Sequence, residues 1–283
     1  MSARLRGIAK ETEEIVEAGR YHLPGGREIR IGTEVSAALE GTRMYGPGPV
    51  PVTPGTDRTT AFEVTGESSM EAARRLTAAD AGPVAVLNFA SARNPGGGYL
   101  NGAQAQEEAL CRASALYVTL LRAPEFYSHH RADRSPFYTD RVIHSPGVPV
   151  FRDDRGRLLD APYTVGFLTS PAPNAGVIAM RTPDQAHRIP AALAARAERV
   201  LETAAGRGYR RLVLGAWGCG VFRNDPAVVA GAFHALLTGG GRFAGHFEEI
   251  VFAVLDRTPA QATLGAFQRT FADRLERLGQ RQP

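Results

Sequence analysis

Residues 83–98 hold the feature that most constrains the fold of this chain, an apolar run followed closely by three consecutive glycines. The run reads PVAVLNF over residues 83–89, and the chain continues as ASARNPGGG. A nearly continuous apolar run of this length is typical of a strand that is buried on both faces of a parallel sheet. Ligands of such sheets bind beyond the carboxyl ends of the strands, which is where the glycines are expected to lie.

Strand-like and helical patterns alternate along the chain. Strands are expected over residues 28–31, 61–64, 83–89, 141–144, 163–169, 211–216 and 250–255. Helices are expected from the start to Glu17, closed by Gly19, then after a capping box of Ser68 and Glu71, and over residues 104–121, 184–205, 225–237 and 259–278. This alternation predicts an α/β domain with a mostly parallel central sheet. Residues 124–158 fit neither period, and we expect irregular structure there, with at most a hairpin.

A proline- and glycine-rich segment divides the chain. Residues 46–56 read GPGPVPVTPGT, a composition typical of an extended connector. We therefore expect residues 1–56 to form an N-terminal helical extension that packs on the core. Residues 57–283 are expected to form the main domain.

Composition and charge exclude several classes of protein. The net charge is +4, but Lys10 is the single lysine among the 33 basic residues, and the arginines are scattered among acids rather than clustered. This pattern argues against a DNA- or RNA-binding surface. No run of eighteen apolar residues predicts a membrane span, and the start lacks the apolar centre of a secretory signal. Cys111 and Cys219 form no disulfide framework, and no metal-ligand spacing is present, so we expect a cytoplasmic protein without a metal.

The first glycine-rich loop contains Gly96, Gly97 and Gly98. Three glycines exceed what a turn requires. They permit positive φ and remove every Cβ, so that backbone N–H groups can approach a ligand closely. Successive N–H groups of this kind bind anions, typically phosphate. The alternative is that the glycines only allow close packing of a strand and a helix.

A second glycine-rich loop follows the expected strand at residues 211–216. Gly215, Gly218 and Gly220 lie between this strand and a helix that begins at Asp225. The loop is neither a dinucleotide fingerprint, because Arg223 replaces the third glycine, nor a phosphate-binding P-loop. Two such loops on neighbouring strands predict a diphosphate held between them. Phe222 would then stand at the rim, where it could stack on a ribose or a base.

The residues Gln106, Glu107 and Glu108 fall in the first turn of the helix after the first loop. Acids are favoured there by the helix dipole alone, which is the simpler explanation. The other explanation is acid–base chemistry, which the geometry limits. Neighbouring helical residues point about 100° apart, so the two carboxylates cannot straddle one bond as glycosidase pairs do. At most one can protonate a leaving oxygen, while the other accepts hydrogen bonds from ribose hydroxyls.

These motifs resemble those of the poly(ADP-ribose) glycohydrolases, which carry GGG followed six to eight residues later by QEE. The sequences NFASARNPGGG, AQEEALCRASALY and LGAWGCGVFRNDP are similar to the short bacterial branch of that family, over about residues 59–256. The resemblance implies a macrodomain-like α/β/α three-layer fold. It also implies hydrolysis of ribose–ribose O-glycosidic bonds in poly(ADP-ribose) with release of ADP-ribose from the chain end. No cofactor is implied. We expect a monomer that acts on ADP-ribosylated proteins in the DNA damage response.

The resemblance also implies roles for individual residues. Glu108 would be the catalytic acid and base, and Glu107 would hold ribose hydroxyls. The implied substrate-binding residues are Asn88, Ser91, Asn94, Gly96, Gly97, Gly98, Gln106, Gly218, Cys219, Gly220, Val221 and Phe222. Two alternatives remain: a macrodomain that only binds ADP-ribose, and a hydrolase that removes single ADP-ribose units from proteins. QEE favours the polymer hydrolase, because a binding module needs no acid there and the mono-hydrolases usually lack the motif.

Overall fold

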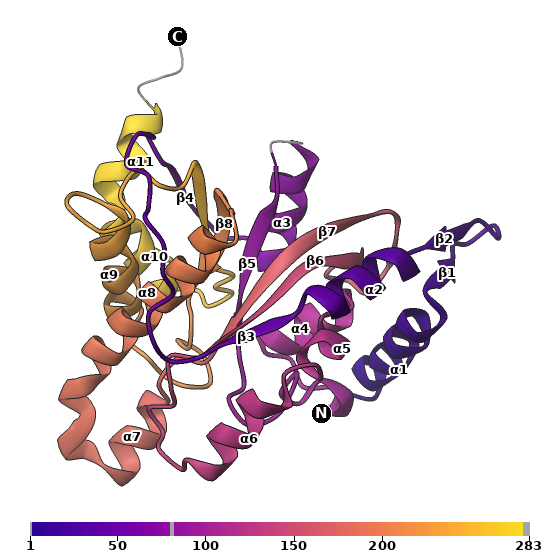
Figure 1. Ribbon diagram of the computed structural model, residues 1–283, viewed down its shortest axis with the longest axis horizontal. Helices are drawn as coiled ribbons and strands as arrows, with labels where there is room; N and C mark the ends of the chain where they lie inside the picture. The colour runs from indigo at the N-terminus through magenta and orange to yellow at the C-terminus, as the bar shows by residue number, and fades with distance from the viewer. Residues whose placement is uncertain (1, 80–81, 280–283) are drawn as a thin grey trace.

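The centre of the molecule is a seven-stranded mixed sheet (Figure 1). The computed structural model describes residues 2–79 and 82–279. In spatial order the strands are β3 (Arg43–Tyr45), β6 (Val142–Arg152), β7 (Leu158–Ser170), β5 (Val84–Phe89), β8 (Arg211–Gly215), β9 (Glu249–Ala253) and β4 (Ala61–Thr65). The pairs from β7 to β4 are parallel, whereas β3, β6 and β7 pair antiparallel. The prediction of a mostly parallel α/β sheet is confirmed.

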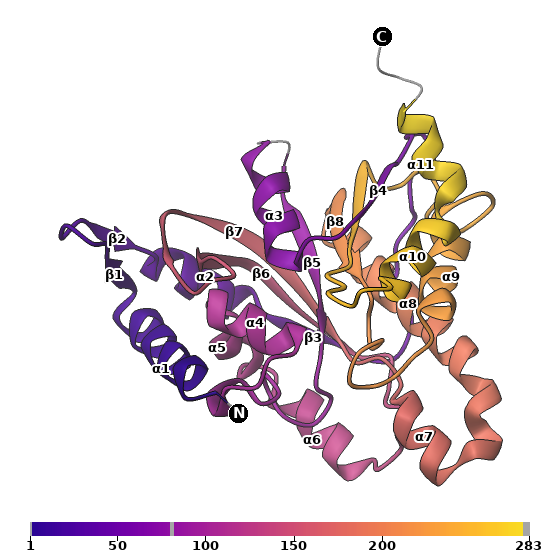
Figure 2. The same ribbon diagram turned by 180° about the vertical axis from the view of Figure 1, so that it is seen from behind.

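Both faces of the sheet are covered by helices (Figures 1 and 2). In β5, Val84 and Val86 belong to one apolar cluster, and Ala85 and Leu87 to the other. This alternation is what a doubly covered strand requires. One face packs against α1 (Ala3–Ala18), α2 (Gly32–Gly41), α3 (Ser69–Ala78), α4 (Gln106–Ala113), α5 (Leu116–Leu120) and α6 (Pro124–Ala132). The other face packs against α8 (Ile189–Gly206), α9 (Pro226–Leu237) and α10 (Ala262–Thr270). The expected three-layer arrangement is confirmed.

The helix expected over residues 104–121 is wrong in one respect, because it is broken in two. Ser114 has an extended backbone, with φ −148° and ψ 177°, and forms a bridge with Val150 of β6. Its hydroxyl donates to the carbonyl of Leu110 and accepts from the N–H of Leu116. The side chain thus supplies hydrogen bonds where the helix stops, and α4 and α5 are separate.

The expectation of irregular structure over residues 124–158 is wrong, whereas the hairpin considered for this segment is present. The segment begins with α6, which has Pro124 in its first turn, a position that proline favours. The strand expected at 141–144 continues to Arg152 and forms a long hairpin with β7. Pro146 and Gly147 interrupt the alternation of apolar and polar residues that marks a strand. The structure accommodates them by a register shift between Ser145 and Val148.

Two more helices differ from expectation. Residues 184–188 belong to a 3₁₀ turn, Pro183–Arg188, that precedes α8. The last helix is interrupted at Phe271, between α10 and α11 (Ala272–Gly279). The Phe271 ring is fully buried, with its centroid 4.4 Å from that of Phe252, so core packing fixes the break. The sequence patterns had not indicated α2, α7 (Ala175–Arg181), β1 (Arg20–His22) or β3; β1 pairs with β2 (Glu28–Arg30) in a small separate sheet.

The N-terminal segment is joined to the main sheet. Ser2 caps α1 and Gly19 ends it with φ +64°. β3 pairs with residues 142–144 as an edge strand of the sheet. The connector at residues 46–56 contains neither helix nor strand, and Glu202 of α8 accepts a hydrogen bond from the N–H of Val50, 2.8 Å away. None of the helices within residues 2–79 and 82–279 is long and apolar enough to cross a membrane.

Candidate active site

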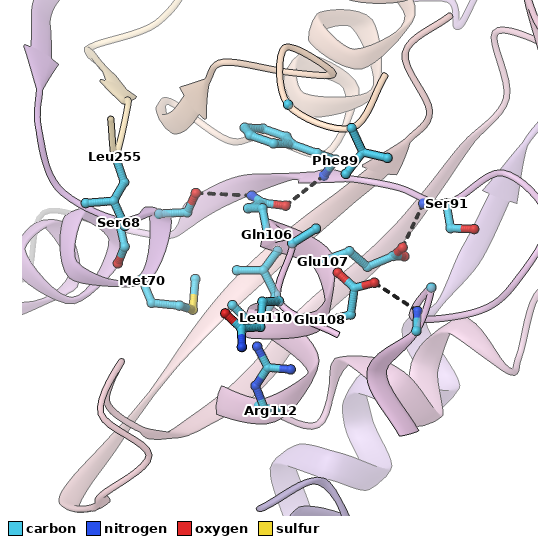
Figure 3. A pocket seen from close by; sticks show the side chains of 18 of the residues that line it. Ser68, Met70, Phe89, Ser91, Gln106, Glu107, Glu108, Leu110, Arg112 and Leu255 are labelled. Atoms are coloured by element: carbon cyan, nitrogen blue, oxygen red, sulfur yellow. Dashed lines mark hydrogen bonds between the residues drawn. The ribbon is translucent and has the colours of Figure 1, made fainter. Parts of the chain in front are cut away.

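The two glycine-rich loops meet at one edge of the sheet. β5 and β8 are neighbours and parallel, with Val84 opposite Arg211 and Val86 opposite Val213, so the loops that follow them emerge side by side. Between them lies a cleft of about 1190 Å³ that is also lined by the first turn of α4 (Figure 3). The expectation that the loops follow adjacent strands is confirmed.

In the first loop, the glycines make room for the carboxylates of α4. Gly97 has φ +58°, and a Cβ there would lie 2.6 Å from Glu108 Oε1 and 3.3 Å from Glu107 Oε2. The N–H of Gly98 donates to Glu108 Oε1 at 2.8 Å. Gly96, with φ +65°, packs instead against Tyr117 and does not line the cleft. The N–H of Gly98, which was expected to bind a phosphate, therefore holds the carboxylate of Glu108 instead.

Glu107 is buried, and each of its two oxygens accepts a hydrogen bond from the protein. Its Oε2 accepts from the N–H of Ser91 at 2.7 Å, and its Oε1 accepts from Asn88 Nδ2 at 3.2 Å. Burial raises the pKa of Glu107 to about 8, although both hydrogen bonds lower it and the nearby charge of Glu108 raises it further. Asn88 does not line the cleft, and it acts on the site through Glu107.

Glu108 has one fixed and one free oxygen. The side chain is 7% exposed and lines the cleft, and Gly98 fixes its Oε1. Its Oε2 is buried and has no hydrogen-bond partner within the part of the chain that the structure describes. An unpartnered buried oxygen is costly unless a ligand or a proton satisfies it. This oxygen is therefore available to a ligand that enters the cleft.

Gln106 fastens the helix to the strand. Its Oε1 accepts from the N–H of Phe89 at 2.9 Å (Figure 3). Its Nε2 donates to the carbonyl of Leu87 at 2.9 Å and to Ser69 Oγ at 3.1 Å. Gln106 lines the cleft, but its amide is used for these contacts. Gln106 thus positions the helix, the first loop holds Glu107, and Glu108 keeps one oxygen without a partner.

The second loop forms the opposite wall. Gly218 has φ +71°, and a Cβ there would lie 2.5 Å from Ala172 Cβ. Residues 218–222 all line the cleft, with Val221 at the exposed rim. The Phe222 ring lies 5.9 Å from that of Tyr138, centroid to centroid. Burial raises the pKa of the Cys219 thiol to about 12, so this cysteine is not a reactive thiolate.

Most of the predicted site residues are brought together. Ser91, Asn94, Gly97, Gly98 and Gln106 to Glu108 line the cleft with residues 218–222, whereas Asn88 and Gly96 stand behind it. Sequence reasoning missed Tyr138, which has φ +58° and faces Phe222. It also missed Leu255, although the rule that ligands bind at carboxyl ends of strands could have pointed to the residues after β9.

The raised pKa of Glu107 predicts a pH dependence of stability. Because the folded pKa, about 8, lies above the unfolded value of 4.5, the folded state binds more protons between these pH values. The free energy of unfolding should therefore fall as pH rises from 5 to 8, and Glu107→Gln should flatten this slope. Urea unfolding of both proteins at pH 5, 6, 7 and 8 measures it. Equal slopes would show that Glu107 is ionised throughout.

Comparison with known proteins identifies the family. The family model described as the microbial-type PARG catalytic domain, PARG being poly(ADP-ribose) glycohydrolase, matches residues 9–153. The chain belongs to this family. It is 52% identical to the glycohydrolase from Thermomonospora curvata, with a TM-score of 0.89 over 95% of this chain and 100% of that one. A structure of that protein holds the inhibitor ADP-HPD.

The glycohydrolase from Deinococcus radiodurans, solved in complex with ADP-ribose, is 47% identical, with a TM-score of 0.79 over 87% of this chain and 99% of that one. No curated protein sequence matches the chain. The chain is thus a microbial-type poly(ADP-ribose) glycohydrolase, as the triple glycine and QEE had predicted. The family model includes the second half of α1 and both glutamates, and the solved structures extend the likeness across the second loop.

Proposed function

We propose that Glu108 is the acid and base with which this glycohydrolase cuts the ribose–ribose bond, and that the distal ADP-ribose unit occupies the cleft. The observation that carries the proposal is the free, buried Oε2 of Glu108. ADP-ribose in the Deinococcus radiodurans structure and ADP-HPD in the Thermomonospora curvata structure support ADP-ribose as the ligand of the cleft.

The second loop offers donors for the diphosphate. The N–H groups of Gly218, Gly220, Val221 and Phe222 have no acceptor among the residues that the structure describes. Consecutive free N–H groups around glycines make an anion-binding concavity. We therefore place the diphosphate on this loop, with Phe222 and Tyr138 beside the distal ribose. Glu107, fixed by the first loop, hydrogen-bonds the ribose hydroxyls through the lone pairs that Ser91 and Asn88 leave free.

In this mechanism Glu108 gives one proton to the leaving oxygen and later takes one from water. Protonated Glu108 donates to the leaving ribose oxygen as the anomeric C–O bond breaks, and the distal ribose becomes oxocarbenium-like. The diphosphate stabilises the positive charge that develops. Ionised Glu108 next takes a proton from a water, which adds to the anomeric carbon. The products are free ADP-ribose and a chain that is one unit shorter.

Incubation with an automodified polymerase tests the proposal against its two alternatives. We expect free ADP-ribose to accumulate while the polymer disappears. Polymer that is retained but uncut would mean a binding module only. Loss of the protein-linked unit alone would mean a mono-ADP-ribosyl hydrolase.

We propose terminal cleavage, since the resemblance to the bacterial branch favours it. Chains labelled at the protein-attached end should then shorten stepwise, with ADP-ribose as the first product. Oligomers released early would contradict it. We place the enzyme in the cytoplasm, acting as a monomer on ADP-ribosylated proteins.

A further inference from the structure

The cleft extends beyond the two glutamates as a groove along the outer face of α4. Ala105 and Ala109 are exposed on this face, and Arg112 lies one turn further along it. The flanks of the groove are the start of α1, with Arg4 and Ile8, and the tip of the β6–β7 hairpin, residues 153–156. From Ala105 to Ala113 the helix rises about 12 Å. The groove is therefore long enough for more than the reacting sugar.

Arg112 is a half-buried cation without an acid partner. It follows Glu108 by four residues, so the two side chains start on the same face of α4 (Figure 3). Its Nη1 donates to the carbonyl of Ala103 at 2.6 Å. Within the described part of the chain, no carboxylate lies within 4 Å of its guanidinium. Burial is the main cause that lowers its pKa, and the charge of Glu108 acts in the opposite direction, although that carboxylate does not pair with the guanidinium.

Arg4 brings a second cation to the same place. Its charge also lowers the pKa of Arg112, and it too has no carboxylate within 4 Å among the described residues. Backbone and side-chain contacts hold α1 there: the N–H of Ser2 donates to the carbonyl of Gly102 at 3.3 Å, and Tyr99 Oη donates to Glu13 Oε1 at 2.8 Å. Arg112 is fixed by the carbonyl of Ala103, and Arg4 is exposed on the helix that these contacts hold. An anion between two such guanidiniums would relieve their repulsion.

The acids around the groove do not fill this role. At the hairpin tip, Asp153 is paired with Arg157, 2.7 Å away. Burial raises the pKa of Asp154, so this carboxyl is disfavoured as an anion. Glu108 is held by Gly98 and faces the reacting bond. An external anion is therefore what the pair Arg4 and Arg112 lacks.

We propose that Arg112 and Arg4 bind the pyrophosphate of the leaving chain, on the unit next to the one that is released. This rests on the proposed function, because it takes Glu108 as the donor to the leaving oxygen. The leaving ribose carries its own pyrophosphate on its 5′ carbon, one sugar away from the bond that breaks. The Cβ atoms of Glu108 and Arg112, four residues apart on a helix, are about 5–6 Å apart, a spacing of the same order. Guanidinium groups match phosphate oxygens in geometry and charge.

Two synthetic substrates test this subsite. One is a dimer of ADP-ribose joined by the ribose–ribose bond, and the other is the same distal ADP-ribose joined to adenosine, which lacks the second pyrophosphate. For Arg4→Gln and Arg112→Gln, the ratio of kcat/KM on the dimer to kcat/KM on the adenosine substrate should fall about tenfold. Lys10→Gln is the matched control, because Lys10 is on the same helix, exposed and outside the cleft. It should leave the ratio unchanged.

The results of these assays decide whether the arginine subsite exists. An unchanged ratio in both arginine variants overturns the subsite. An equal loss on both substrates also overturns it, since it would mean that the arginines only support the loop at Ala103. If the unmodified enzyme cuts neither substrate, the proposed function itself fails. If it cuts both but the ratio does not respond to the variants, the subsite alone fails.

Discussion

Glu108→Gln is expected to reduce kcat for ADP-ribose release by about 10³-fold, within the range that positioned acid–base groups contribute. The amide keeps the size of the side chain, and its oxygen can still accept from the N–H of Gly98. It cannot give a proton to the leaving oxygen or take one from water. Release of ADP-ribose from an automodified polymerase, followed at pH 7, measures the loss.

The same variant should still bind ADP-ribose within a few-fold, because the diphosphate donors lie on the second loop. Isothermal titration with ADP-ribose checks this. The matched control is Glu34→Gln, which removes an exposed acid from the first turn of α2, away from the cleft, and should leave kcat unchanged. A Glu108→Gln enzyme that digests polymer at the normal rate would remove Glu108 from the mechanism.

The parts of the fold and site that could be predicted are local in sequence. The strand before the first loop is marked by an apolar run, and Gly97 and Glu108 are marked by a short motif. The prediction that β5 and β8 are neighbours rested on the similar loops that follow them, because β6 and β7 lie between the two strands in the chain. Short motifs mark the glycines and the acids, and the carboxyl ends of the strands bring these residues together.

The parts that could not be predicted depend on contacts between distant segments. Tyr138 reaches the cleft because its loop is anchored by Asp140, whose carboxylate accepts from Arg196 of α8 at 3.0 Å. Ser114 ends α4 by bridging with Val150. Arg4 joins the groove only because α1 packs on the turn after the triple glycine. No periodic pattern or short motif predicts contacts between distant segments, so Tyr138 and Arg4 were absent from the predicted site.

Gly97→Ala is expected to reduce kcat about 10²-fold while the protein stays folded. The left-handed φ of +58° costs an alanine about 1–2 kcal/mol of stability. The larger effect is on catalysis, because the new Cβ would come within 2.6 Å of Glu108 Oε1 and must push the carboxylate away from the N–H of Gly98. A displacement of about 1 Å at a reacting group is enough for such a loss.

Gly208→Ala separates backbone strain from displacement of the carboxylate. Gly208 has φ +78°, similar to that of Gly97, but a Cβ there meets nothing within 4 Å, and the residue lies outside the cleft. Both variants should therefore lose about 1–2 kcal/mol in urea unfolding, and only Gly97→Ala should lose turnover of the polymer. The crystal structure of Gly97→Ala should show the Glu108 carboxylate turned from Gly98. Normal kcat in Gly97→Ala would mean that the contact between Gly98 and Glu108 does not set the position of the acid.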